Sequence, residues 1–293
     1  MLRLNDVRKS FGKTVAVDGL SLAVHPGEVL GLLGPNGAGK TTTIGMAVGL
    51  LHPDQGTVTL GSSEGDGPDL VGTPADPAVR TMVGVAPQEV ALYDAMSARE
   101  NLVLFGRLHG LSRHQAKARA GDLLEMVGLS ERADHKVHGF SGGMKRRLNL
   151  ACALVAQPRM VLLDEPTAGV DPQSRHAIFE IIAQLKTDGV TVLFSTHYME
   201  EAARLCDRVA IVDRGRLLAL GTIDELIEAH GGPSIVVIRR EGENDETRTE
   251  TITPLDTVSQ AIHADGATIT ELRIDKPDLE AVFLHLTGRE HRD

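Results

Sequence analysis

Short apolar runs alternate with amphipathic stretches along most of this 293-residue chain. Runs bounded by turn residues predict strands at 1–7, 20–24, 27–33, 56–61, 80–87, 160–166 and 190–197. Apolar residues at three- and four-residue spacing predict helices at 40–49, 97–110, 113–128, 139–154, 178–189 and 199–207. Residues 61–79, rich in Gly, Pro and Asp, are expected to form a surface loop. The alternation predicts an α/β fold built on a parallel sheet with right-handed crossovers.

Two stretches depart from this alternation. Residues from about 97 to 158 are helical and lie between two predicted strands, so we expect a helical subdomain inserted into the α/β core. Beyond residue 228 the pattern predicts a strand at 233–240, a solvated charged hairpin or loop at 241–250, and helices at 255–266 and 277–288. We therefore expect a first domain over 1–228 and a small C-terminal α+β domain over 229–293.

Composition and charge narrow the class of protein. Aromatic residues make up only 3% of the chain, so the hydrophobic 42% is mostly aliphatic, as in parallel sheets covered by helices. The formal net charge of −10 argues against nucleic acid as a partner. Cys152 and Cys206 lie in apolar helical patterns and are predicted to be buried, reduced thiols, which indicates a cytosolic chain. Residues 1–12 lack the apolar core of a signal peptide, and no apolar run reaches the roughly 20 residues of a membrane helix.

The clearest chemical motif is "GPNGAGKT", which follows the apolar run at 27–33 and matches GxxxxGK[ST]. Its glycines let backbone amides close around phosphate oxygens, helped by the positive end of the next helix. Lys40 supplies a charge for the β- and γ-phosphates, and the Thr41 hydroxyl suits Mg²⁺. The predicted phosphate-binding residues are Gly34, Pro35, Asn36, Gly37, Ala38, Gly39, Lys40, Thr41 and Thr42.

Three predicted strands carry polar side chains at their carboxyl ends, the edge at which open α/β sheets bind ligands. "MVLLDEP" ends in Asp164, predicted to hold Mg²⁺, and Glu165, predicted to polarise an attacking water. "VTVLFSTH" ends in His197, which is predicted to sense the γ-phosphate. Gln88 ends the strand at 80–87 and is predicted to contact water or Mg²⁺, with simple packing as the alternative.

The helix predicted at 139–154 begins in an unusual way. Ser141, Gly142 and Gly143 leave the first backbone amides almost uncovered, which favours binding of an anion. The lysine and two arginines at 145–147 then place positive charge where the helix dipole disfavours it. We expect most of these three side chains to form a solvated face.

In this order, the phosphate loop, Gln88, "SGGM", "VLLDEP", "AGVD" and His197 resemble the ATP-binding subunit of ABC transporters over about the first 220 residues. "YDAMSARENLVLFGRLHGL", "FSGGMKRRL" and "PDLEAVFLHLTG" are similar to the bacterial drug- and antibiotic-exporter branch, the daunorubicin-resistance type. The resemblance implies a P-loop NTPase with a RecA-like parallel sheet core, an antiparallel β subdomain and the inserted helical subdomain. It also favours stacking of Phe11 on the purine, with filling of the core as the alternative.

The resemblance further implies a head-to-tail dimer of two copies. Ser141, Gly142 and Gly143 of one copy would then bind, in trans, the ATP held by the phosphate loop of the other, and Asp171 would contact the partner copy. It implies hydrolysis of ATP with Mg²⁺, with catalysis by Glu165 aided by Lys40, Gln88 and His197. It also implies separate transmembrane permease subunits, a location on the cytoplasmic face of the cell membrane, and no nucleic acid.

The chain departs from the usual family pattern in three places. Phe140 and Met144 stand where Leu and Gln are frequent, and "AGVD" stands where "SALD" or "SGLD" is usual. Backbone contacts to ATP need neither side chain, so ATP binding is still expected. The alternative function is a soluble ABC-type ATPase that is not coupled to transport. The transported substrate, the direction of transport, the membrane subunits and the role of 229–293 stay open at this point.

Overall fold

The computed structural model describes residues 1–61, 71–241, 247–252 and 268–288. The chain divides into two compact units, Met1–Leu220 and Gly221–Asp293. The predicted helix at 255–266 and the first part of the predicted loop at 61–79 lie outside the described residues.

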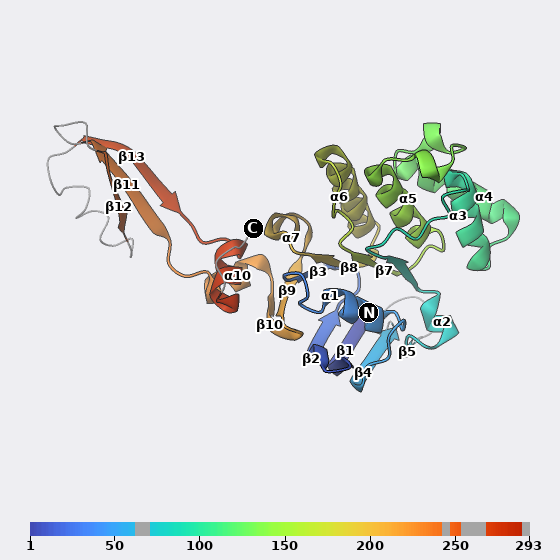
Figure 1. Cartoon of the computed structure of the whole chain (residues 1–293), viewed down its shortest axis with the longest axis horizontal. Helices are drawn as coiled ribbons and strands as arrows, with labels where there is room; N and C mark the ends of the chain where they lie inside the picture. Colours follow the sequence, from blue (N-terminus) through green and yellow to red (C-terminus); the bar gives the residue numbers. More distant parts are fainter. Residues whose placement is uncertain (62–70, 242–246, 253–267, 289–293) are drawn as a thin grey trace. The chain divides into compact units, whose positions relative to one another are not determined.

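A sheet ordered β10-β9-β3-β8-β7-β6 forms the core of the first unit (Figure 1). Its strands are β3 (Val29–Leu33), β6 (Val83–Ala86), β7 (Met160–Asp164), β8 (Thr191–Thr196), β9 (Arg208–Asp213) and β10 (Arg216–Gly221). From β6 to β9 neighbouring strands pair in parallel. β3, β7 and β8 are buried along their whole length, which explains their uninterrupted apolar runs. The predicted parallel core is confirmed, whereas β9 and β10 were not predicted from the sequence.

A second sheet, ordered β2-β1-β4-β5, packs on the same hydrophobic core. It consists of β1 (Leu2–Phe11), β2 (Thr14–Val24), β4 (Gln55–Gly61) and β5 (Val71–Gly72), and its strands pair antiparallel. The antiparallel subdomain is therefore confirmed. β2 begins well before the predicted strand at 20–24, because register shifts between β1 and β2 interrupt the simple alternation on which that prediction relied.

Four helices belong to the core of the first unit: α1 (Lys40–Ala47), α2 (Pro77–Arg80), α6 (Pro172–Thr187) and α7 (Met199–Leu205). α1 contacts β7 of the parallel sheet and β1, β2 and β4 of the antiparallel sheet, so it joins the two. The predicted loop at 61–79 contains β5 and most of α2. The last residue of α2 is Arg80, which was predicted to begin the strand at 80–87. Asp76 caps α2 and Pro77 opens it, signals that the loop-like composition hid.

The helical block, defined here as residues 97–154, contains α3 (Ala98–Leu108), α4 (Arg113–Met126) and α5 (Gly142–Leu154) (Figure 1). Ser97 and Ser112 each form a capping box with the residue three positions on, which fixes where α3 and α4 begin. Short 3₁₀ turns at Ser130–Arg132 and Val137–Gly139 lead into α5. The block follows β6 and precedes β7, so the predicted insertion is confirmed.

The second unit combines a sheet ordered β12-β11-β13 with helices, which confirms a small α+β unit. Its described elements are α8 (Ile223–His230), β11 (Ile235–Glu241), β12 (Thr247–Ile252), β13 (Thr268–Asp275) and α10 (Leu279–Thr287). β12 pairs antiparallel with β11, so the charged stretch at 241–250 belongs to a β-hairpin, the first of the two predicted alternatives. Because α8 packs on α10, the division between the units precedes α8, and the boundary predicted at 228/229 falls inside that helix.

Candidate functional site

The phosphate loop runs from the buried end of β3 to the start of α1, where it is tightly confined by neighbouring backbone. Gly39 has a φ of 99°, and a Cβ at this position would lie 2.4 Å from the Ala16 carbonyl oxygen. A Cβ on Gly34 would lie 2.3 Å from the Val212 carbonyl oxygen. Only glycine fits at these two positions, so the loop keeps its backbone close to β2 and β9 and directs α1 away from the sheet edge.

A polar hollow of about 420 Å³ opens at this loop. Six of the predicted phosphate-binding residues line it, together with two of the strand-end residues: Asn36, Gly37, Gly39, Lys40, Thr41, Thr42, Gln88 and Glu165. Gly34, Pro35 and Ala38 belong to the same loop but do not line the hollow. Thr14, Val15 and Ala16 complete the wall, and the sequence analysis missed them. These three residues are the first of β2, so the hollow is bordered by both the antiparallel and the parallel sheet.

Lys40 and Glu165 form an ion pair at the bottom of this hollow. The distance from Lys40 Nζ to Glu165 Oε1 is 3.1 Å, and the residues are only 5% and 7% exposed. The same ammonium donates to the carbonyl oxygens of Gly34, at 2.8 Å, and Pro35, at 3.1 Å. The three donors of the ammonium are thus matched by protein oxygens, which compensates for its burial.

Glu165 has a backbone conformation that is uncommon for a residue with a side chain. Its φ is 44°, and its N–H donates to Ser195 Oγ at 2.9 Å. Ser195 Oγ in turn donates to Asp164 Oδ1 at 2.6 Å. β7 and β8 pair with Asp164 opposite Ser195, so the serine holds both acidic residues at the sheet edge. Such strain in a buried, hydrogen-bonded residue is typical of functional sites.

Gln88 and His197 approach the same carboxylate from two other segments. Gln88 Nε2 donates to Glu165 Oε2 at 3.3 Å, and His197 Nδ1 lies 3.4 Å from Glu165 Oε1 without making a hydrogen bond to the described residues. Gln88 is exposed, which excludes the alternative that it merely packs in the core. The structure therefore brings together Lys40, Gln88 and His197 around Glu165, although they are far apart in the sequence.

The start of α5 presents its first residues to the surface. Ser141 caps the helix, its Oγ accepting from the Met144 N–H at 3.2 Å. Ser141 and Gly142 are exposed, and no atom lies within 4 Å of a Cβ placed on Gly142. Gly143 is buried, and a Cβ there would lie 2.0 Å from Ser174 Oγ. Ser141, Gly142 and Gly143 do not line the phosphate-loop hollow of their own chain.

The basic residues that follow do not form the solvated face that we expected. Lys145 Nζ donates to Asp94 Oδ1 at 2.9 Å, Arg146 donates to the Gln88 carbonyl oxygen, and Arg147 donates to the Val127 carbonyl oxygen at 2.6 Å. All three side chains are half-buried. The charges disfavoured by the helix dipole are therefore compensated by carboxylate and carbonyl oxygens of neighbouring segments.

Asp171 and Phe11 do not line the hollow. Asp171 caps α6, accepting from the Ser174 N–H at 2.9 Å and from Ser174 Oγ at 2.7 Å. These hydrogen bonds hold the pKa of Asp171 below its usual value. Phe11 is 49% exposed, with Lys9 Nζ 5.9 Å from its ring centroid, so the alternative that Phe11 fills the core is wrong.

Known proteins share both this sequence and this fold. A sequence profile of the family described as ABC transporter matches residues 17–168. The chain belongs to the ABC transporter family. As a member it is an ATP-binding, ATP-hydrolysing subunit that powers an ABC transporter.

Several ABC relatives match the chain from end to end. A linearmycin resistance ATP-binding protein of Bacillus subtilis is 40% identical, with 100% of each chain covered. A Nod factor export ATP-binding protein of Paraburkholderia xenovorans is 43% identical, covering 100% of this chain and 98% of the relative. A daunorubicin resistance ATP-binding protein of Streptomyces coeruleorubidus is 39% identical, covering 99% and 97%. The resemblance to the exporter branch is thereby confirmed.

Solved ABC structures share the fold of most of the chain. The structure of an ATP-binding subunit of an ABC transporter has a TM-score of 0.67 at 31% identity, over 78% of this chain and 92% of that one. A dimeric ATP-binding cassette in a post-hydrolysis state, bound to ADP and Pi, has a TM-score of 0.66 at 26% identity, over 76% and 98%. The P-loop NTPase fold is therefore confirmed.

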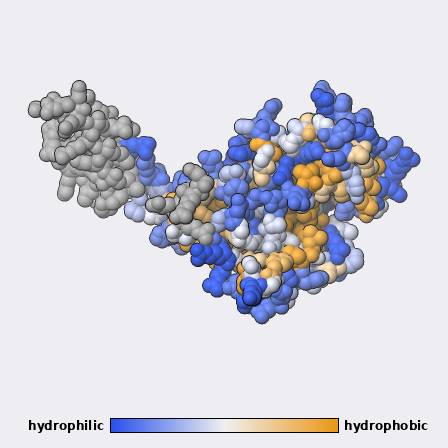
Figure 2. All heavy atoms as spheres, in the orientation of Figure 1, coloured by the Kyte–Doolittle hydropathy of each residue, from blue (hydrophilic) through white to orange (hydrophobic). Residues whose placement is uncertain are grey.

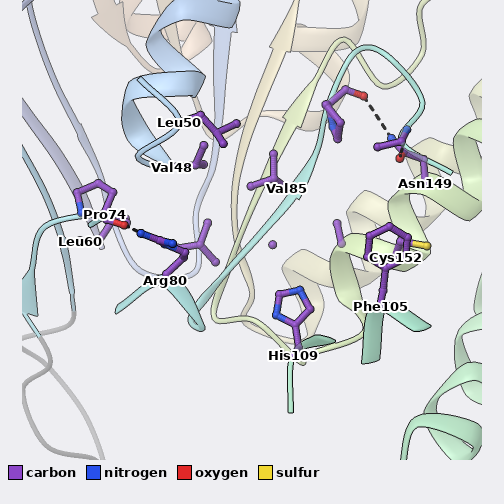
Figure 3. A pocket seen from close by; sticks show the side chains of 15 residues that line it. Val48, Leu50, Leu60, Pro74, Arg80, Val85, Phe105, His109, Asn149 and Cys152 are labelled. Atoms are coloured by element: carbon purple, nitrogen blue, oxygen red, sulfur yellow. Dashed lines mark hydrogen bonds between the residues drawn. The ribbon is translucent and has the colours of Figure 1, made fainter. Parts of the chain in front are cut away.

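An apolar groove of about 270 Å³ separates the core of this ABC subunit from its helical block (Figure 3). The groove is lined by residues from four parts of the chain: Val48 and Leu50 after α1, Val85 of β6, Phe105 of α3 with His109 directly after that helix, and Cys152 of α5. Figure 2 shows hydrophobic side chains on the surface of the helical block and of the adjoining part of the core. No helix among the described residues is long and apolar enough to span a membrane.

Proposed function

We propose that this subunit drives the export of a hydrophobic compound through separate permease subunits, working as a head-to-tail dimer on the cytoplasmic face of the membrane. The observation that carries its ATPase role is the convergence of Lys40, Gln88 and His197 on the buried Glu165 carboxylate, beside the phosphate loop. Export is supported by three full-length relatives named for linearmycin resistance, daunorubicin resistance and Nod factor export.

Glu165 is proposed as the general base for hydrolysis. In this structure its carboxylate is paired with Lys40. Phosphate oxygens entering the hollow would compete with the Glu165 carboxylate for the Lys40 ammonium. Once the ammonium binds phosphate, the carboxylate is free to accept a proton. Attack of water on the γ-phosphorus then forms the new P–O bond, breaks the bond to ADP and leaves the water's proton on Glu165. His197 is proposed to contact the γ-phosphate.

The donor set at the hollow suits Mg²⁺ bound together with ATP. Thr41 and Gln88 offer a hydroxyl and an amide oxygen on its wall, and Asp164 lies at the same sheet edge. Mg²⁺ prefers a few oxygen ligands plus substrate phosphates to an all-protein cage. The described residues contain no group of three or more His, Cys, Asp or Glu side chains that could hold a metal ion. When bound, the ion would neutralise charge on the phosphates. Thr41, Gln88 and Asp164 are the residues proposed to hold it.

The second set of phosphate contacts is proposed to come from the partner copy. Ser141 and Gly142 expose backbone at a helix start, and they do not line the hollow of their own chain. Asp171 is held against Gly143 through Ser174, so its proposed contact with the partner copy lies beside these residues. The dimeric cassette among the structural neighbours supports this arrangement. Phe11, exposed at the end of β1, is proposed to stack on the purine.

The variant Glu165→Gln tests the proposal. It keeps the shape of the side chain but removes the base, so we expect ATP binding to persist, turnover to fall by roughly 10²-fold or more, and an ATP-bound dimer to accumulate. Turnover is measured by phosphate release and assembly by size-exclusion chromatography with light scattering. Glu89→Gln, an exposed carboxylate one residue after Gln88, is the matched control and should behave as wild type.

Ser141→Arg separates contacts within one chain from contacts in trans. We expect it to block dimer formation and hydrolysis, while the monomer binds ATP as tightly as wild type, because the hollow of its own chain is intact. A collapse of monomer binding would show that Ser141 acts within its own chain.

Wild-type turnover in Glu165→Gln would remove Glu165 from the mechanism.

The apolar groove is proposed as the docking site for a cytoplasmic helix of the permease. Its lining is mostly apolar and it is open to the surface. Its wall includes Pro87 and Ala91 of the segment that carries Gln88, together with Asn149 of α5, which is hydrogen-bonded to both. A helix seated there would therefore touch the residues next to the nucleotide site. Without such a partner the chain would be an ATPase not coupled to transport.

A further inference from the structure

The short segment that carries Gln88 is fastened to α5 by two side chains. Arg146 Nη1 donates to the Gln88 carbonyl oxygen and lies 3.5 Å from the Pro87 carbonyl oxygen. Asn149, one turn further along α5, donates from Nδ2 to the Pro87 carbonyl oxygen at 3.2 Å (Figure 3). Its Oδ1 accepts from the Ala91 N–H at 3.2 Å. The backbone is therefore held on both sides of Gln88.

These contacts are not incidental surface hydrogen bonds. Asn149 is only 4% exposed and uses both ends of its amide on this one segment. Arg146 is half-buried, and burial lowers the pKa of its guanidinium, while the negative charges of Glu165 and Asp164 oppose that effect. The guanidinium thus lies within the electrostatic field of Glu165 and Asp164.

We propose that Arg146 and Asn149 are positioning residues, which set the Gln88 side chain against Glu165 by tying its backbone to α5. Gln88 is exposed and reaches Glu165 Oε2 across 3.3 Å, so its own side chain makes only one described contact with the site. The two α5 side chains supply the fixed backbone from which that contact is made. This inference rests on the proposed roles of Glu165 and Gln88.

The tie also gives α5 a direct mechanical connection to the nucleotide site of its own chain. α5 begins at Gly142, one residue after Ser141, and Arg146 lies one turn further on. A displacement of the start of α5 is therefore passed through Arg146 to the Gln88 backbone.

The neighbouring Arg147 provides a matched control. It lies on the same helix, is also half-buried and carries the same charge, but it donates to the carbonyl oxygens of Val127 and Gly128 inside the helical block. Arg146→Met and Arg147→Met remove the same group from adjacent positions. Only the first removes a tie to Gln88.

The experiment is a double-mutant cycle in the full-length chain, measuring kcat and KM for ATP in wild type, Arg146→Met, Gln88→Ala and the combined variant. We expect Arg146→Met to lower kcat by about tenfold with KM unchanged, and to cause no further loss when Gln88 is already Ala. Arg147→Met should keep the wild-type kcat. Arg146→Lys, which retains the charge and a donor, should recover most of the rate.

Several outcomes would overturn the inference: an unchanged kcat in Arg146→Met, an equal loss of kcat in Arg147→Met, or a full additional loss in the combined variant. If Arg146→Met does not fold, the same cycle is run with Arg146→Lys, whose smaller loss must also disappear in the Gln88→Ala background. Glu165→Gln distinguishes failure of the proposed function from failure of the positioning role alone. Wild-type turnover in that variant defeats the proposed function, whereas a dead Glu165→Gln with an additive cycle defeats only the positioning role.

Discussion

At the scale of single residues, the buried ion pair of Lys40 and Glu165 is the central feature of the proposed nucleotide site. Both side chains are almost fully buried. Among the described ion pairs, Lys40 pairs with Glu165, and Glu165 also lies 3.4 Å from His197, which is charged only if protonated. Burying two charges is costly, and removing one of them leaves the other without compensation. The proposed mechanism requires the phosphates of ATP to replace the Glu165 carboxylate as the partner of the Lys40 ammonium.

Lys40→Met is expected to impair both binding and folding stability. ATP affinity should fall because the cation for the β- and γ-phosphates is lost, and the nucleotide-free protein should lose roughly 3 kcal/mol of stability because the Glu165 carboxylate stays buried unpaired. Nucleotide titration and urea unfolding measure the two effects. Arg99→Met, which breaks an exposed ion pair with Asp134 in the helical block, is the control and should change neither. Unfolding unchanged in Lys40→Met would mean that the pair contributes nothing to stability.

At the scale of elements, α5 unites three tasks. Its first residues are exposed and are proposed to meet a partner copy, its middle holds the Gln88 segment by hydrogen bonds, and its buried face packs on β6, β7 and α6. Gly142 and Gly143 show how different two adjacent glycines are. Gly142 faces open space, whereas Gly143 lies against Ser174, the residue that Asp171 holds at the start of α6.

Gly143→Ala is expected to destabilise the protein by roughly 1–3 kcal/mol, because the new Cβ would overlap Ser174 and force α5 and α6 apart. Gly142→Ala is the matched control and should unfold at the wild-type urea concentration or slightly above it, since Ala is the better helix former. Both are measured by urea unfolding without nucleotide. Equal stability of the two variants would show that the contact between α5 and α6 is loose.

At the scale of the whole molecule, the first unit contains every residue of the nucleotide site and the apolar groove. The structural neighbours cover about the same share of the chain as this unit, 76–78%. ATP binding and the proposed docking of a permease therefore belong to one compact body. The assignment of 229–293 as a separate functional domain stays a prediction.

Phe105→Glu tests the docking of a membrane partner. Placing a charge in the apolar groove should abolish co-purification of a multi-helix membrane protein from membranes of the chain's own organism, while ATP binding by the isolated subunit stays at the wild-type level. Leu108→Glu changes an exposed residue of the same helix outside the groove and should leave co-purification intact. The partner is identified by mass spectrometry. Retention of the same membrane protein by Phe105→Glu would place the docking site elsewhere.

The sequence by itself determined the parts whose physics is local. The phosphate loop could be predicted because glycine spacing between a strand and a helix leaves few other conformations, and Asp164, Glu165, Gln88 and His197 because apolar runs end at them. Helix starts such as Ser97 and Ser112 also carry their own caps. These features depend on neighbours within a few residues.

Only the tertiary structure decided which of these residues meet and what holds them. Ser195 lies between Asp164 and Glu165 because of the register of two parallel strands, and Arg146 reaches Gln88 because α5 packs beside β6. Register and packing depend on residues distant in sequence, so no local pattern encodes them. For the same reason the basic residues at 145–147 looked solvated in the sequence but are bonded in the fold.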